Sequence, residues 1–143
     1  MSRRDARTAA VKILFGYSFS VTDGTPDSIE KLIEEYMQDF DDSEGGAAEE
    51  YIYLCDVVRG TVSHLAEIDS LIKSCLKGWD FDRLGKTDIA ILRVAVYEMK
   101  YRDDIPESIS INEAVELAKK YCDDDSPSYM NGVLGSIYKL IKQ

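Results

Sequence analysis

The sequence predicts an all-α protein of about seven helices joined by short connections. Apolar residues recur three and four positions apart through most of the 143 residues, which is the spacing of one helix face. No segment alternates apolar and polar residues between turn signals as a strand does, and no unit repeats at a fixed period. The length suits one ordinary domain, so we expect a single domain over residues 1–143 with one continuous core.

Residues 88–99 are predicted as the central helix, against which the others pack. Apolar side chains occupy nearly every face of this stretch, so the helix should be buried nearly all round. Those at helical spacing are Ile91, Leu92, Ala95, Val96 and Met99. The stretch is too short and too interrupted by charges to span a bilayer. We expect Arg93 and Glu98 to lie at its edges in ordinary ion pairs, because an unpaired charge is costly to bury.

Two helices are expected before residue 41. The first covers residues 3–20, and alanines supply much of its apolar stripe. The second opens at Thr25-Pro26, a capping residue followed by proline at the first helical position, and runs to about Phe40. An acidic loop that contains glycine follows over residues 41–46.

Two further helices and a turn are expected before the central helix. The third helix starts near Ala48 and carries its apolar positions at Ile52, Leu54, Val57, Val58, Thr61 and Leu65. The fourth helix carries Ile68, Leu71, Ile72, Cys75 and Leu76, and whether the chain bends near His64 stays open. Gly60 suits a close approach of another helix. Residues 78–85 form a compact turn that aromatic residues such as Trp79 should hold in place.

Two helices are expected after the central one. Ile105-Pro106 ends the central helix, because a residue before proline avoids the helical region. Ser110 and Glu113 stand three residues apart, as in a capping box that opens a helix. The last helix opens at Asp125-Ser126-Pro127, again a cap followed by proline.

The net charge of −10 is concentrated in one segment. Residues 23–50 hold eleven acids and one base, and the remainder is neutral, so a basic patch elsewhere is compatible with the composition. The three cysteines form no CxxC pair, which fits a reducing compartment. No signal-peptide pattern opens the chain. We therefore expect a cytoplasmic protein that does not enter a membrane.

No constellation of an enzyme or a metal site is present in the sequence. Phosphate-binding, dinucleotide, zinc-protease and nucleophile-elbow motifs are absent, and His64 is the single histidine. The acids at 123–125 lack the ligand spacing and turn glycine of a calcium loop, and they suit the N-terminus of a helix. We expect no catalysis, no cofactor and no metal.

The first helix instead suggests single-stranded RNA. Its polar half, opposite the alanines, holds Arg3, Arg4, Arg7, Thr8 and Lys12 together with Phe15 and Phe19. Cations can contact phosphates while aromatic rings stack on bases. Such a cluster near a terminus can also be a solvated face without function. Tyr129 lies off the apolar stripe of the last helix, where it would stack on a base or pack against a neighbouring helix.

These segments, in their order and spacing, resemble the NusB family of bacterial transcription antitermination factors over nearly the whole chain. The matching segments are 4–7 with 10–14, Trp79 through 83–84, 91–98, 104–106, 111–119 and 131–134. The resemblance implies an all-α fold of two three-helix-type sub-bundles packed across each other. It also implies a partner, the small-subunit ribosomal protein NusE, and boxA-type RNA in nascent, especially ribosomal, transcripts of the elongation complex.

The resemblance further implies the site residues. The resemblance implies that the RNA-binding residues are Arg3, Arg4, Arg7, Lys12, Asp125 and Tyr129. It also implies that Asp88 contacts the protein partner. The sequence departs from the family pattern at Asp5, inside the arginine cluster, and in its acidic second helix.

Two other functions are compatible with the sequence. One is a helical scaffold that binds protein but no RNA. The other is a stand-alone relative of the N-terminal domain of ribosomal RNA methyltransferases, since the chain has no room for a cofactor-binding domain. A homodimer that masks the RNA site also stays open.

Overall fold

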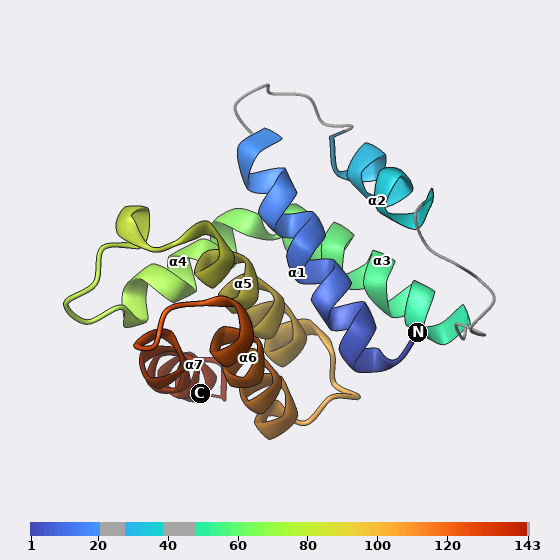
Figure 1. Ribbon diagram of the computed structural model, residues 1–143. Coiled ribbons are helices and arrows are strands. Elements are labelled where there is room, and N and C mark those ends of the chain that lie inside the picture. Colours follow the sequence, from blue (N-terminus) through green and yellow to red (C-terminus); the bar gives the residue numbers. More distant parts are fainter. Residues whose placement is uncertain (21–27, 39–47, 143) are drawn as a thin grey trace.

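The computed structural model describes residues 1–20, 28–38 and 48–142, and these ranges hold seven α-helices and no strand (Figure 1). The helices are α1 (Arg3–Ser20), α2 (Ser28–Gln38), α3 (Ala48–Ser63), α4 (Leu65–Cys75), α5 (Lys86–Tyr101), α6 (Glu107–Tyr121) and α7 (Ser126–Lys142). A short 3₁₀ helix, η3 (Phe81–Arg83), lies before α5. The predicted all-α class is confirmed, whereas the predicted cap at Thr25-Pro26 and the acidic loop lie outside the described residues.

The helices form two groups that meet at α5. The first group is α1, α2 and α3, which pack on one another; the second is α4 to α7 (Figure 1). α5 contacts both groups, because it packs on α1 and α3 as well as on α4, α6 and α7. The two sub-bundles that the family resemblance implies are therefore present, the second with four helices.

The prediction of a central buried helix is confirmed. Every residue of α5 from Ile89 to Glu98 is buried, and the Leu92 side chain is 0% exposed. The close packing of α3 on α5 depends on Gly60, since a Cβ atom at that position would lie 2.2 Å from the Tyr97 ring. No helix among the described residues is both long enough and apolar enough to cross a membrane.

The expected position of Glu98 is wrong. Glu98 is 0% exposed in the middle of the fold, where Arg7 Nε lies 2.8 Å from its Oε2 and Arg7 Nη2 lies 3.1 Å from its Oε1. The hydroxyls of Tyr53 and Ser110 also donate to this carboxylate. A buried carboxylate is tolerated when an opposite charge and further donors satisfy it. Arg93 is buried as well, so its expected edge position is also wrong, but it does form the expected ion pair, with both oxygens of Asp69 at 2.8 Å.

The same carboxylate explains two other differences from the sequence predictions. The predicted capping box is wrong, because α6 already begins at Glu107 with Pro106 as its N-cap, and Ser110 lies inside the helix as a buried donor to Glu98. Ile52 was predicted as apolar core but is 62% exposed, while its neighbour Tyr53 is fully buried. Tyr53 can point inward because Glu98 accepts its hydroxyl hydrogen.

The chain does bend near His64, which the sequence left open. α3 ends at Ser63 and α4 begins at Leu65, with His64 between them at φ −113° and ψ 24°. The His64 ring stacks on Tyr101 of α5 with 4.3 Å between ring centroids. This contact ties the bend to the end of the central helix.

Candidate nucleic-acid interface

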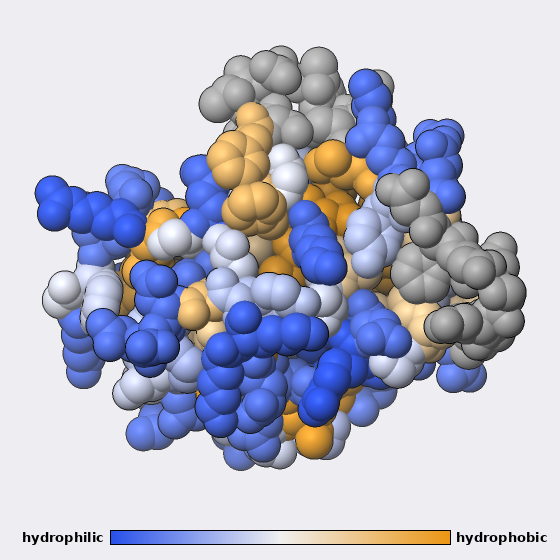
Figure 2. Space-filling model, in the orientation of Figure 1, coloured by the Kyte–Doolittle hydropathy of each residue, from blue (hydrophilic) through white to orange (hydrophobic). Residues whose placement is uncertain are grey.

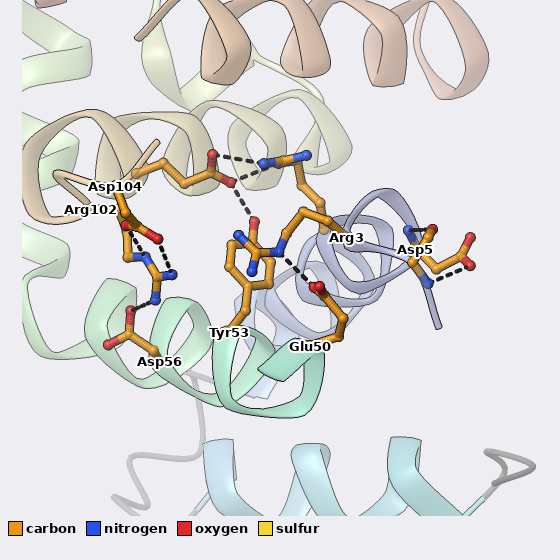
Figure 3. Close-up of polar contacts among 10 residues, drawn as sticks. Arg3, Asp5, Glu50, Tyr53, Asp56, Arg102 and Asp104 are labelled. Atoms are coloured by element: carbon orange, nitrogen blue, oxygen red, sulfur yellow. Dashed lines mark hydrogen bonds and ion pairs between the residues drawn. The ribbon is translucent and has the colours of Figure 1, made fainter. Parts of the chain in front are cut away.

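All three arginines near the start of α1 are paired with carboxylates from other helices. Arg3 Nε lies 2.6 Å from Glu50 Oε2 on α3, and its guanidinium lies 4.2 Å from the centre of the Tyr53 ring (Figure 3). Arg4 binds Glu113 of α6, and Arg7 binds Glu98 of α5. The structure thus neutralises most of the charge that the sequence assigned to an open basic face.

Arg7 differs most from the prediction, because it is only 4% exposed and lies on no open face. Burial acts to lower the pKa of Arg7, but the hydrogen bond and charge of Glu98 and the nearby Tyr53 outweigh it, so the pKa rises. Arg7 therefore stays charged and joins α1 to α5. In this position it has no surface to offer a phosphate.

Lysines on α1, α5 and α6 remain available for an anion. Lys12 is exposed and makes no ion pair with any described residue. Lys86 Nζ lies 5.7 Å from the centre of the Phe19 ring, and Lys120 Nζ lies 5.2 Å from that of Tyr121. Lys86 and Lys120 thus each have an aromatic neighbour, and Lys120 also shares a cleft with Asp5, Glu113 and Glu116.

The exposed rings around these lysines complete a continuous surface. Phe15 and Phe19 meet edge to face at 5.1 Å and are 38% and 55% exposed, and Tyr121 is 40% exposed. A small cleft of about 150 Å³ is lined by Lys12, Phe15 and Tyr121 among others. We call the six residues Lys12, Phe15, Phe19, Lys86, Lys120 and Tyr121 the lysine–aromatic strip. Figure 2 shows apolar side chains gathered beside strongly hydrophilic ones on the face over α1.

A second cleft, of about 390 Å³, brings together three of the predicted site residues. Asp88, Asp125 and Tyr129 all line it. Asp88 Oδ2 accepts hydrogen bonds from Tyr129 at 2.5 Å and from Ser126 at 2.8 Å. The Tyr129 ring stacks on Trp79, with 5.0 Å between centroids and 26° between planes. Asp88 thus positions Tyr129, a relation that the sequence did not reveal.

The charge of this second cleft is negative. Its lining includes Asp80, Asp88, Asp123 and Asp125 against one arginine, Arg83. A phosphate would be repelled there, whereas a cationic side chain would be attracted. Trp79 is 47% exposed and covers one face of the Tyr129 ring. Of the two stacked rings, that of Trp79 is therefore the one more exposed to solvent. Sequence reasoning treated Trp79 only as a residue that holds a turn.

The clefts follow one another across the surface. Thr87 lines the cleft of the lysine–aromatic strip, and the next residue, Asp88, lines the acidic cleft. Thr8 lines both the strip cleft and a third cleft that contains Arg4 and Glu113. Arg4 and the strip therefore border clefts that share Thr8, and Tyr129 lines the cleft that contains Asp88, while Arg3 and Arg7 join α1 to α3 and α5.

The described residues give no sign of a metal site. No group of three or more histidine, cysteine or acidic side chains among them is placed to hold a metal ion. Burial and a hydrogen bond to Asp88 raise the pKa of the Cys122 thiol to about 12, so it stays protonated at neutral pH.

Comparison with known proteins agrees with this fold. The NusB family model matches residues 4–139, and the chain belongs to the NusB family. The transcription antitermination protein NusB of Acetivibrio thermocellus is 41% identical over 140 residues, which cover 98% of this chain and 90% of that protein. The corresponding protein of Geobacter sulfurreducens is 38% identical over 136 residues, covering 95% of this chain and 93% of the relative. The resemblance seen in the sequence is confirmed.

Solved structures extend the similarity. A structure of T. maritima NusB has a TM-score of 0.83 and 33% sequence identity, covering 97% of this chain and 92% of the other. A structure of the antitermination factors NusB and NusE in complex with double-stranded RNA has a TM-score of 0.79 and 29% identity, covering 96% of each chain.

Proposed function

We propose that this protein is a transcription antitermination factor that binds boxA-like single-stranded RNA together with the ribosomal protein NusE. It would act without catalysis, as a single-domain cytoplasmic adaptor between a nascent transcript, NusE and the elongation complex. Membership of the NusB family supports this function. The similarity to an NusB that was solved with NusE and double-stranded RNA supports RNA and NusE as partners.

The lysine–aromatic strip is the observation that carries the proposal. Lys12, Lys86 and Lys120 would contact phosphates, and exposed rings such as Phe15 and Tyr121 would stack on bases. Exposed rings favour single strands, because bases in a duplex already stack on each other. The exposed acids Glu30, Glu34 and Glu35 of α2 would disfavour RNA on that helix and so favour this face.

The predicted site residues then divide by role. Arg3 and Arg7 would act indirectly, since their ion pairs to α3 and α5 fix the orientation of the helix that carries Lys12. The acidic cleft with Asp88 and Asp125 would face the basic ribosomal protein, which opposite charge can steer and orient. Tyr129 and Trp79 would lie where the RNA path meets that partner.

Fluorescence titration of a labelled boxA-like RNA at several salt concentrations, with and without NusE, tests this function. Three lysine–phosphate contacts predict a log–log salt slope of about −2. Lys12→Ala combined with Lys120→Ala should flatten the slope by about 1.4, because each contact contributes about 0.7. Lys31→Ala on α2 is the matched control, since it removes an exposed lysine among acids, and it should leave the slope unchanged.

The alternative is a protein-binding scaffold without RNA contact. The internal pairing of Arg3, Arg4 and Arg7 favours it, because these charges are already neutralised. Binding of NusE with no measurable RNA affinity at low salt would establish the scaffold. An unchanged slope in the double lysine variant, with RNA still bound, would move the RNA site away from the strip.

A further inference from the structure

The ion pair between Arg4 and Glu113 uses only two of the five N–H donors of the Arg4 guanidinium. Arg4 Nε lies 3.1 Å from Glu113 Oε2, and Arg4 Nη2 lies 2.9 Å from Glu113 Oε1. The Arg4 side chain nevertheless remains 69% exposed, whereas the Glu113 side chain is 17% exposed. Glu113 thus holds an arginine that still faces solvent.

The free part of Arg4 has a defined shape. A guanidinium carries five N–H donors in one plane, and the carboxylate takes two of them along the Nε–Nη2 edge. The Nη1–Nη2 edge keeps two parallel N–H donors, and no other described residue bonds to them. A bidentate pair restrains the plane, so these two donors are oriented before any ligand arrives.

The surroundings of Arg4 are polar but carry no net charge. Its cleft, of about 350 Å³, is lined by three basic residues (Arg4, Lys119 and Lys120) and three acids (Asp5, Glu113 and Glu116). Lys119 is itself paired with Glu116 at 3.1 Å. Because its acids and bases balance, the cleft attracts a phosphate less than the lysine–aromatic strip does, and its hydrogen-bonding groups suit a neutral nucleobase. Thr8 joins it to the cleft of the lysine–aromatic strip, so a bound strand would pass it.

We propose that Arg4, held by Glu113, reads the edge of one guanine base in the bound RNA. This inference rests on the proposed RNA-binding function and adds a specificity-determining residue to it. The outer edge of guanine presents two adjacent acceptors, O6 and N7, which match two parallel N–H donors. Adenine pairs an acceptor with a donor on that edge, and uracil presents a single acceptor there. Arg4 then contributes base preference, while the strip lysines contribute salt-dependent affinity.

Oligouridine decamers with one central substitution test the proposal, with the full chain and NusE present. An unstructured uridine tract allows any register, so a single guanine can reach the cleft. We expect guanine to bind about tenfold or more tightly than adenine or uridine at that position, the usual range for one bidentate contact. Replacing guanine by 7-deazaguanine, which lacks only the N7 acceptor, should remove most of this preference. Arg4→Ala should remove it as well, and the two changes together should cost no more than either alone.

Two acid variants test the role of Glu113. Glu113→Gln should weaken the guanine preference and steepen the salt slope by about 0.7, because Arg4 regains an uncompensated charge. Glu116→Gln, one helical turn further along α6, releases Lys119 in the same way and should steepen the slope equally. It should leave the guanine preference intact, because the pair between Arg4 and Glu113 remains.

Several results would overturn the proposal. These are an undiminished guanine preference in Arg4→Ala, a preference that 7-deazaguanine retains, or a preference for cytosine, whose pairing edge also has two adjacent acceptors. Loss of the guanine preference from Glu116→Gln as well would overturn the role of Glu113. The proposed RNA-binding function would survive each of these outcomes as long as Lys12→Ala with Lys120→Ala still flattens the salt slope.

Discussion

Replacing Arg7 with methionine should destabilise the fold much more than it changes the salt dependence of RNA binding. The substitution removes the cation whose Nε and Nη2 lie 2.8 and 3.1 Å from the Glu98 carboxylate. Glu98, which is 0% exposed, would keep only the hydroxyls of Tyr53 and Ser110 as donors. A buried carboxylate left without its counter-charge costs about 3–5 kcal/mol of folding free energy.

That cost is a large part of the stability of an ordinary domain, which is about 5–15 kcal/mol. For a chain of this size it corresponds to a fall in melting temperature of roughly 10 °C. Urea unfolding followed by circular dichroism measures the free energy, and a thermal melt gives the temperature. The RNA titration, carried out well below the melting temperature, should show an unchanged salt slope because Arg7 contacts no phosphate.

A double variant separates the lost charge from the lost packing. In Arg7→Met with Glu98→Gln the buried charge is gone, and the glutamine oxygen can still accept from Tyr53 or Ser110. The double variant should therefore lose much less stability than Arg7→Met alone. A loss below about 0.5 kcal/mol in Arg7→Met, together with a flatter salt slope, would mean that Arg7 lies on an open basic face. The buried pair would then be refuted.

Three further predictions address the core, the partner surface and pH. Leu92→Ala, at a position that is 0% exposed in α5, should cost about 2–5 kcal/mol in urea unfolding, and a loss under about 0.5 kcal/mol would contradict the central helix. Asp123→Lys on the acidic cleft should weaken NusE binding in calorimetry with little change in the melt, whereas Asp103→Lys, in the turn after α5, should leave NusE binding unchanged. Equal binding by both variants would exclude the cleft as the partner surface. Burial and a hydrogen bond to Asp56 raise the pKa of Tyr97 to about 12, above the value near 10 in the unfolded chain. The protonated phenol therefore stabilises the folded state fully below pH 10, and this stabilisation is lost as the pH rises towards 12. Alkaline unfolding of Tyr97→Phe should accordingly depend less steeply on pH across that window, and an identical pH dependence would count against the buried phenol.

The sequence alone determined the helices and the family. Helical spacing of apolar residues identifies α5 as the buried centre, because the pattern depends only on which side chains share a helix face. The ordered short motifs identify the NusB family for the same reason, since they are read along the chain. The nearness of cations and aromatics on α1 was likewise visible, and Lys12, Phe15 and Phe19 do form part of one exposed surface.

Only the tertiary structure decided which of those charges remain available. Arg7 and Glu98 are 91 positions apart, and Arg4 and Glu113 are 109 apart, so no local pattern indicates that they pair. Periodicity places a side chain on a face of its own helix but does not reveal which acid the neighbouring helix presents to it. The same limit applies to Ser110, which resembled a cap, and to Trp79, whose stacking on Tyr129 joins α7 to the turn before α5. Ion pairs and stacked rings between distant segments form only once the helices have packed, and that packing pairs Arg3, Arg4 and Arg7 while Lys12 keeps no ion pair with any described residue.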